Sequence, residues 1–236
     1  MKQDMNAYTT DDKLVWKTLF DRQKENLKDK VSAEYKQALE TMQPVLNANN
    51  IPNIKEINQW FKNYTNWEIV IVPGLIPVEE FFELLAQKKF CSSTWLRTMQ
   101  QLDYLEEPDM FHDIFGHVPL LVNPVFSDFM QKFGKVGCSV IDNKSKVTQL
   151  QRLYWYTIEF GMINPHQPTI YGAGIISSYG ETNRCIQPNI PKINFEIKNV
   201  LSKPFHTDQV QDDYICIDSF QSLFQSLEGI EHILED

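Results

Sequence analysis

The sequence lacks the features that mark several protein classes. Its four cysteines are scattered, with neither a disulfide-like nor a metal-binding spacing, so we expect reduced thiols in a cytoplasmic protein and no thiolate metal site. No apolar run is long enough to span a bilayer, and the polar residues 1–13 do not form a secretory signal. The net charge of −9, with no basic cluster to offset it, argues against nucleic-acid binding.

The 236 residues suffice for one large domain with a sizeable core and a buried site. We expect a flexible lead over residues 1–12 and the folded domain over 13–236. Helical patterns cover 13–30, 31–47, 54–64, 78–88, 124–135 and 145–162, a last helix begins at Asp218, and β-like runs occupy 67–72 and 214–217. The sequence therefore predicts a single α+β domain that is mainly α, with a few short strands.

Two histidines form the most informative local pattern. His112 and His117 lie five residues apart in the run PDMFHDIFGHVP. On a regular α-helix such residues point about 140° away from each other. Gly116 lies between them and Pro119 follows, so we expect His112 on a helix and His117 at its frayed end, turned back toward His112. The alternative is a pair of capping or core histidines.

Glu159 is the third candidate ligand. It lies in the helical segment 150–162, which is apolar nearly all round and is therefore expected to be buried. A buried carboxylate is costly unless it is paired with a cation or bound to a metal. A salt bridge would satisfy it, but the two histidines upstream favour metal ligation. Two imidazoles and a carboxylate suit ferrous iron with open coordination positions, and they also suit catalytic zinc.

Three blocks of sequence resemble the pterin-dependent aromatic amino acid hydroxylases, in particular their short bacterial branch that acts on phenylalanine. The blocks run from Asp103 to Leu121, from Tyr154 to Gly161 and from Tyr171 to Glu181, in the family's order and spacing. The resemblance extends from about Trp16 to about Phe220. It implies a monooxygenase that converts L-phenylalanine to L-tyrosine with O₂, a tetrahydropterin and non-haem iron(II). It also implies a monomer without the regulatory and tetramerising segments of animal members.

The resemblance implies roles at matching positions. The iron ligands would be His112, His117 and Glu159. Arg97 would bind the substrate carboxylate through its planar guanidinium, although without the resemblance it would be taken for an exposed surface residue. Asp109 would orient Arg97, and Ser177 would hydrogen-bond the first histidine.

Apolar residues near the histidines are candidates for the walls of the site. The slot for the substrate ring would be lined by Pro108, Trp155 and Phe115. The pterin pocket would be formed by Gly74, Ile76, Phe81, Asp113 and Tyr154, with Phe81 stacked on the ring. Ordinary core packing is the commoner role for aromatic residues, and it remains the alternative for each of them.

One position departs from the pattern of the animal enzymes. Leu105 stands where those that act on phenylalanine have a threonine that helps to bind the substrate carboxylate. Leucine has no hydroxyl, so carboxylate binding is expected to depend more on Arg97 and Ser177.

Three other functions stay open. Hydroxylation of tryptophan or tyrosine is the first, and Thr207, near a specificity position of the family, is not the aspartate that would favour tyrosine. A zinc hydrolase with the same ligands is the second, although Asp113 stands where such an enzyme has a glutamate after its first histidine. A non-catalytic protein that keeps the fold is the third.

Overall fold

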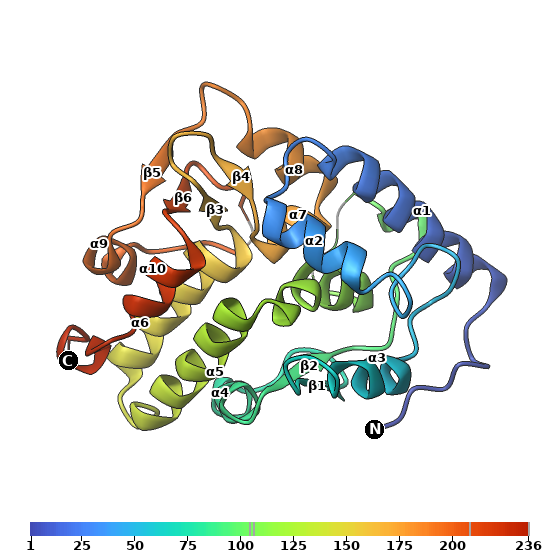
Figure 1. Cartoon of the computed structure of the whole chain (residues 1–236), viewed down its shortest axis with the longest axis horizontal. Helices are drawn as coiled ribbons and strands as arrows, with labels where there is room; N and C mark the ends of the chain where they lie inside the picture. The colour runs from blue at the N-terminus through green and yellow to red at the C-terminus, as the bar shows by residue number, and fades with distance from the viewer. Residues whose placement is uncertain (104, 106, 208, 236) are drawn as a thin grey trace.

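The computed structural model describes residues 1–103, 105, 107–207 and 209–235. The α-helices are α1 (Thr10–Leu27), α2 (Ala33–Thr41), α3 (Ile54–Phe61), α4 (Val78–Ala86), α5 (Pro124–Ser139), α6 (Lys144–Tyr154), α7 (Ala173–Ser177), α8 (Tyr179–Cys185), α9 (Ile197–Ser202) and α10 (Phe220–Gln225). The π-helices are η2 (His112–His117) and η4 (Trp155–Glu159), and the 3-10 helices are η1 (Met99–Gln101), η3 (Pro119–Val122) and η5 (Ile230–His232). The predicted fold class, α+β and mainly α, is confirmed (Figure 1).

The strands are β1 (Glu68–Ile71), β2 (Lys89–Ser92), β3 (Met162–Ile163), β4 (Thr169–Ile170), β5 (Lys192–Asn194) and β6 (Tyr214–Ile217). β1 and β2 pair in parallel, and the other strands form a sheet in the order β4-β3-β6-β5. In that sheet β3 and β4 are antiparallel, while β6 runs parallel to both of its neighbours and is buried along its whole length. In Figure 1 this sheet lies at the upper left and the β1–β2 pair at the bottom. The two π-helices lie between them in the chain, because η2 follows β2 and η4 leads into β3.

An aromatic core supports one side of η2. The ring of Trp16 on α1 meets Phe111 edge-on at 5.6 Å, and Phe20 meets Phe115 at 5.1 Å. Phe111 and Phe115 are fully buried and stack on each other with their ring centroids 4.7 Å apart. This packing anchors η2 to α1 by one face, and its other face carries the two histidines toward a cavity.

The first helix starts earlier than predicted. α1 begins at Thr10, inside the range expected to be a flexible lead, and Thr9 caps it. Thr9 Oγ1 accepts a hydrogen bond from the Asp12 N–H at 3.1 Å, and Asp12 Oδ2 accepts one from the Thr9 N–H at 2.7 Å. This reciprocal capping box is a local sequence signal that the prediction overlooked.

The residues before α1 also contact the domain. Gln3 Nε2 donates to the carbonyl of Pro52 at 2.9 Å, and the Tyr8 hydroxyl donates to the carbonyl of Thr94 at 2.7 Å. The expectation of a flexible lead over 1–12 is therefore corrected, because polar side chains of this segment have fixed partners in the folded part of the chain.

Two other helix ends differ from the predicted ones. The helix expected over 31–47 is the shorter α2, which ends at Thr41 three residues before Pro44, where the N–H needed for a regular helix is missing. The segment expected as one helix over 145–162 consists of α6 followed by η4. None of the helices within the described ranges combines the length and the apolarity needed to cross a membrane.

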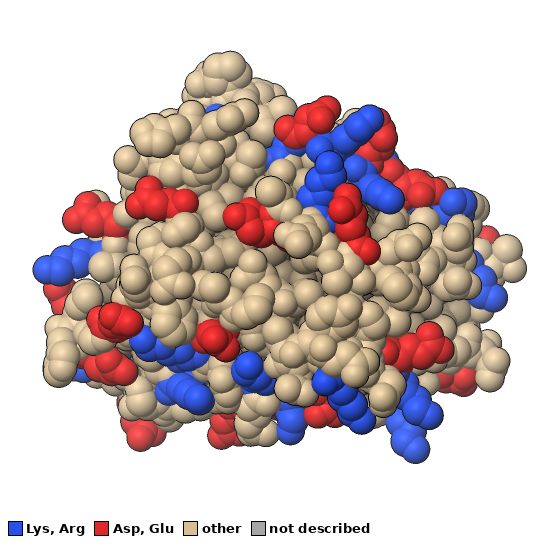
Figure 2. Space-filling view, in the orientation of Figure 1, with Lys and Arg blue, Asp and Glu red and all other residues tan. Residues whose placement is uncertain are grey.

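Charged side chains of both signs are interspersed on the face shown in Figure 2. Among the side chains drawn there, basic groups lie beside acidic ones and form no extended basic surface. On this face acidic and basic side chains therefore alternate, in a chain whose net charge is −9.

Candidate metal centre and its cavity

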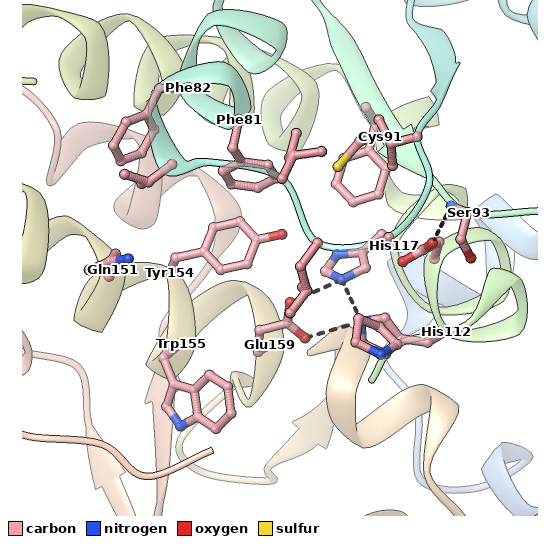
Figure 3. A pocket seen from close by; sticks show the side chains of 18 of the residues that line it. Phe81, Phe82, Cys91, Ser93, His112, His117, Gln151, Tyr154, Trp155 and Glu159 are labelled. Atoms are coloured by element: carbon pink, nitrogen blue, oxygen red, sulfur yellow. Dashed lines mark hydrogen bonds and ion pairs between the residues drawn. The ribbon is translucent and has the colours of Figure 1, made fainter. Parts of the chain in front are cut away.

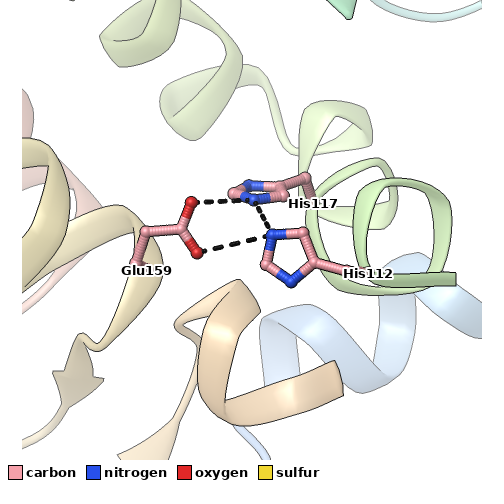
Figure 4. A group of neighbouring side chains, drawn as sticks. All are labelled: His112, His117 and Glu159. Atoms are coloured by element: carbon pink, nitrogen blue, oxygen red, sulfur yellow. Dashed lines mark hydrogen bonds and ion pairs between the residues drawn. The ribbon is translucent and has the colours of Figure 1, made fainter. Parts of the chain in front are cut away.

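His112, His117 and Glu159 converge on one point (Figure 4). His117 Nε2 lies 3.1 Å from Glu159 Oε1, His112 Nε2 lies 3.6 Å from Glu159 Oε2, and the two Nε2 atoms are 3.1 Å apart. Metal–ligand bonds to nitrogen and oxygen are about 2.0–2.2 Å long, so donor atoms about 3 Å apart surround a single ion. The three predicted ligands therefore lie together, although Glu159 follows the histidines by 42 residues or more in the sequence.

The winding of η2 explains the five-residue spacing. In a π-helix the hydrogen bonds join residues i and i+5, and each turn holds more residues than an α-helical turn. His112 and His117 are the two ends of such a turn, so their side chains share a face. The expectation that His117 lies at a frayed helix end was wrong, because the chain widens its winding and continues directly into η3. Glu159 ends the second π-helix, η4, and both ligand segments thus use the same local device.

Ser177 determines which imidazole nitrogen of His112 faces the centre. Ser177 Oγ donates to the carbonyl of Ala173 at 2.8 Å and lies 2.8 Å from His112 Nδ1. Since its single hydroxyl hydrogen is donated to the carbonyl of Ala173, the serine oxygen accepts a hydrogen bond from Nδ1–H of His112. This leaves the lone pair of Nε2 directed at the centre, as a ligand requires.

Gly116 allows α7 to come this close to η2. A Cβ atom on Gly116 would lie 2.9 Å from the carbonyl oxygen of Ala173, closer than real Cβ atoms approach. Ala173 is the first residue of α7, which carries Ser177 one turn later. Glycine is therefore needed here for the contact between helices rather than for an unusual backbone angle.

Arg97 and Asp109 form a buried pair beside η2. Arg97 Nε donates to Asp109 Oδ2 at 2.9 Å, and Arg97 Nη2 donates to Oδ1 at 2.8 Å. Asp109 also accepts the N–H of His112 at 3.1 Å. Arg97 is only 7% exposed, which excludes the surface role that composition alone suggested. The aspartate thus joins the arginine to the start of the ligand-bearing helix.

Burial and charge set the protonation of the group. Burial lowers the pKa of His112 to about 4, so its imidazole is neutral near pH 7. Burial acts to raise the pKa of Glu159, but interactions with His117 and then His112 outweigh it, and the net pKa lies below its usual range. For Asp109, burial is likewise outweighed by hydrogen bonds and charge from Arg97, which lower the pKa. The imidazole of His112 and the carboxylate of Glu159 are therefore in the protonation states that divalent iron or zinc binds.

A cavity of about 300 Å³ opens beside the three ligands (Figure 3). Its walls include these predicted residues: Gly74, Ile76, Phe81, Pro108, Asp113, Tyr154 and Trp155. Phe81 meets Tyr154 edge-on at 5.2 Å, and Asp113 Oδ2 accepts the N–H of Ser93 at 2.9 Å. Burial raises the pKa of Asp113 to about 7. The cavity is mostly apolar, with polar groups gathered near the ligands, as is usual for a small-molecule site.

Other predicted residues lie elsewhere. Phe115 is on the core face of η2 and does not line the cavity, so its assignment to the substrate slot is corrected. Arg97, Asp109 and Ser177 lie behind the ligands and are not on the cavity wall. Leu105 is half-buried and Thr207 is exposed. Tyr104 and Glu106, which belong to the first resembling block, fall outside the described residues.

The cavity also has walls that the sequence prediction missed. These are Val72, Val78, Phe82, Phe90, Cys91, Ser93, Phe133, Gln151 and Phe205, while Leu75 lies within the predicted stretch from Gly74 to Ile76. Gln151 precedes Tyr154 by three residues on α6, so helical spacing was a usable signal for it. Phe205 lies about 50 residues after Trp155 and has no local signal, since only folding brings it to the site.

Comparisons with known proteins agree over nearly the whole chain. The family model of the biopterin-dependent aromatic amino acid hydroxylases matches residues 3–235. The phenylalanine-4-hydroxylase of Ralstonia nicotianae is 43% identical over 228 residues, which cover 96% of this chain and 72% of that protein. The phenylalanine-4-hydroxylase of Chromobacterium violaceum is 42% identical over 228 residues, covering 96% of this chain and 76% of that protein.

A solved structure agrees with the fold. The Chromobacterium violaceum phenylalanine hydroxylase with bound iron(III) and 7,8-dihydrobiopterin has a TM-score of 0.93 to this chain at 40% identity. The similarity covers 99% of this chain and 85% of that one.

Proposed function

This chain belongs to the biopterin-dependent aromatic amino acid hydroxylases, and we propose that it hydroxylates L-phenylalanine to L-tyrosine with O₂, a tetrahydropterin and iron(II). The observation that carries the proposal is the convergence of two imidazoles and one carboxylate at the end of an aromatic cavity. Relatives with 40–43% identity that are named phenylalanine hydroxylases give the substrate.

His112, His117 and Glu159 hold the iron in this proposal, and their donor set fits it. Bound iron and tetrahydropterin supply the activation of O₂ and the insertion of one oxygen atom into the ring. The chain itself supplies position and a dry cavity. Ser177 keeps Nε2 of His112 directed at the metal, and the N–H of His112 is held by Asp109.

The substrate ring would lie between Pro108 and Trp155, which both line the cavity. Its carboxylate would be bound by Arg97, which is not itself on the cavity wall but pairs with Asp109, the residue after Pro108. Three N–H groups of Arg97 are engaged by Asp109 and by the carbonyl of Leu102, which leaves the outer edge of the guanidinium for a ligand. A rigid planar cation of this kind suits a carboxylate. The aromatic walls exclude water from the position where the ring is oxidised.

In this proposal the pterin would be held by the cavity wall that contains Phe81 and Tyr154, which meet edge-on at 5.2 Å. Phe81 would stack on its ring system, the backbone from Gly74 to Ile76 would bond its edge, and Tyr154 would close the pocket. Asp113 uses one carboxylate oxygen for the N–H of Ser93, and the other is left for the N–H groups of a pterin.

We further propose that residues 13–236, together with the preceding segment that contacts them, form the catalytic domain and that the chain acts as a cytoplasmic monomer. All four cysteines, each within the described ranges, are free of disulfide bonds, which supports a reducing compartment. Sedimentation at several protein concentrations measures the oligomeric state, and a mass that doubles with concentration would contradict the monomer.

The function is tested by reconstituting the protein with iron(II) without oxygen and then adding O₂, tetrahydropterin and phenylalanine. We expect tyrosine to form only when every component is present, and zinc in place of iron to give none. Product from tryptophan at a higher kcat/KM than from phenylalanine would favour the tryptophan hydroxylase. Hydrolytic activity with zinc and no pterin would favour the zinc hydrolase.

A further inference from the structure

The indole of Trp155 is fixed by a residue that has no assigned role. Trp155 Nε1 donates to Gln211 Oε1 at 3.0 Å, and Gln211 is only 8% exposed. In Figure 3 the indole nitrogen points away from Glu159, so the carbon edge of the ring is the part nearer the metal ligands. A wall of the cavity is thus oriented by a hydrogen bond on its outer side.

Gln211 is itself held so that its oxygen faces the indole. The side-chain Nε2 of Gln211 donates to the backbone carbonyl of Gln209 at 3.2 Å. The backbone carbonyl of Gln211 accepts a hydrogen bond from Nε of Arg184 at 3.0 Å. Since the amide nitrogen already faces a carbonyl, the amide oxygen is the atom presented to the indole N–H. Arg184 lies on α8, so the backbone of Gln211 is bonded to a helix and not only to its own loop.

One ring that packs against the indole belongs to the same stretch of chain as Gln211, residues 203–213, whereas Phe160 packs against it from the end of η4. Phe205 stacks on Trp155 with ring centroids 4.9 Å apart and an angle of 25°, and both rings line the cavity. The ends of the stretch 203–213 have polar partners. Lys203 Nζ lies 2.8 Å from Asp213 Oδ2, and the Tyr156 hydroxyl donates to the carbonyl of Pro204 at 2.6 Å. A wall built from loop residues is thus held in place by the polar contacts around it.

We propose that Gln211 is a positioning residue that holds the plane of Trp155 and thereby sets which aromatic side chain the cavity accepts. The proposal rests on the proposed function, since it assigns the Trp155 wall to the substrate ring. A buried indole N–H seeks an acceptor, and without Gln211 the ring turns toward another partner or toward water. The slot then loses its fixed width, and the preference for the ring of phenylalanine over the larger ring of tryptophan falls.

The test is a double-mutant cycle with Gln211→Met and Trp155→Phe, which remove the acceptor and the donor respectively. We expect Gln211→Met to raise KM for phenylalanine about tenfold, to change kcat less than twofold, and to lower the preference for phenylalanine over tryptophan. In the Trp155→Phe background the same change should have no further effect. Gln209→Met is the matched control, because this neighbour is exposed and contributes only its backbone carbonyl.

An equal effect of Gln211→Met in both backgrounds would overturn the proposal, since Gln211 would then act on the loop and not through the indole. A second readout does not need turnover. In protein labelled with ¹⁵N-tryptophan and loaded with zinc, the Trp155 indole signal is identified by its absence in Trp155→Phe. Its N–H should exchange with solvent at least about tenfold faster in Gln211→Met than in the wild type.

The two proposals fail in different ways. Wild-type protein that makes no tyrosine would remove the proposed function, and the exchange measurement would still test the contact. Normal tyrosine formation with equal indole exchange in wild type and Gln211→Met would overturn the role of Gln211 alone.

Discussion

The two sides of the cavity are held in different ways. On the metal side, each of four residues has polar partners at 2.8–3.6 Å: His112, Glu159, Ser177 and Asp109. These partners lie on the π-helices or on helix α7, apart from Asp109 and Arg97, which pair with each other. On the aromatic side, Phe81, Trp155 and Phe205 are placed by ring contacts at 4.6–5.2 Å. Gln211 adds the polar contact that orients Trp155.

This difference follows from what each side must bind. A metal accepts donor atoms within narrow limits of distance and direction, so its ligands need directional hydrogen bonds behind them. An aromatic ring is recognised by the shape of a slot, and apolar packing can provide that with fewer fixed directions. Substitutions on the metal side should therefore reduce iron binding or turnover more than substitutions on the aromatic side weaken the binding of substrate or pterin.

The largest effect is expected for Glu159→Ala. The variant loses the only carboxylate in the ligand group and leaves two imidazoles, so iron binding should weaken by more than about a hundredfold and turnover should disappear. Iron retained after desalting measures this. Glu196→Ala, at an exposed position, is the control and should bind iron normally. Full iron content in Glu159→Ala would remove Glu159 from the ligand set.

Arg97→Lys comes next. Lysine keeps the charge but cannot form the two-pronged contact with Asp109 or a carboxylate, so KM for phenylalanine should rise by about a hundredfold while iron stays bound. The free energy of unfolding should fall by about 1.5–3 kcal/mol, because Asp109 is fully buried and loses a charged hydrogen bond. Kinetics, iron content and thermal melting separate these effects. Loss of iron would instead show that Arg97 acts on His112 through Asp109.

Ser177→Ala should have a smaller effect on the same side. Without the hydroxyl, Nδ1 of His112 loses its acceptor, and iron binding should weaken by about 10–100-fold. An iron(II) titration followed by a competing chelator measures the change. Ser178→Ala is a close control, since that hydroxyl accepts the N–H of Glu181 at the start of α8. Equal iron affinity in Ser177→Ala and the wild type would show that the tautomer needs no fixing by Ser177.

The smallest effect is expected on the aromatic side, for Phe81→Leu. An aromatic contact contributes about 0.5–1.5 kcal/mol beyond burial, so KM for the pterin should rise about threefold to tenfold with no change in bound iron. Steady-state kinetics with the pterin varied give the result. A larger effect than that of Ser177→Ala would contradict the proposed contrast between the two sides.

Much of the metal side was predictable from local sequence. Residue types alone identified His112, His117 and Glu159 as ligand candidates, because a carboxylate in an apolar helix needs a partner. The geometry between them was not predictable in the same way. Five-residue spacing suits an α-helix badly, and the π-helix that joins the two histidines packs through Phe111 and Phe115 against α1, which lies about 90 residues earlier.

The aromatic side shows the opposite balance. The resemblance suggested Phe81, Tyr154 and Trp155, and all three line the cavity, whereas Phe115, a candidate because of its place between the histidines, lies in the core. Aromatic residues serve both roles, and their type does not say which face of a helix they occupy. Phe205 and Gln211 carried no local signal because each acts through a contact more than 45 residues away in sequence.

The sequence by itself determined the chemistry of this protein: the ligand types, the mainly helical α+β class and the family, since these depend on residue identity and local spacing. Tertiary structure alone decided the geometry. It chose the π-helical winding that joins His112 to His117, buried Arg97 on Asp109, and turned Trp155 toward Gln211. The physical reason is that donor identity is a property of single residues, whereas distance and direction depend on packing between segments far apart in the chain.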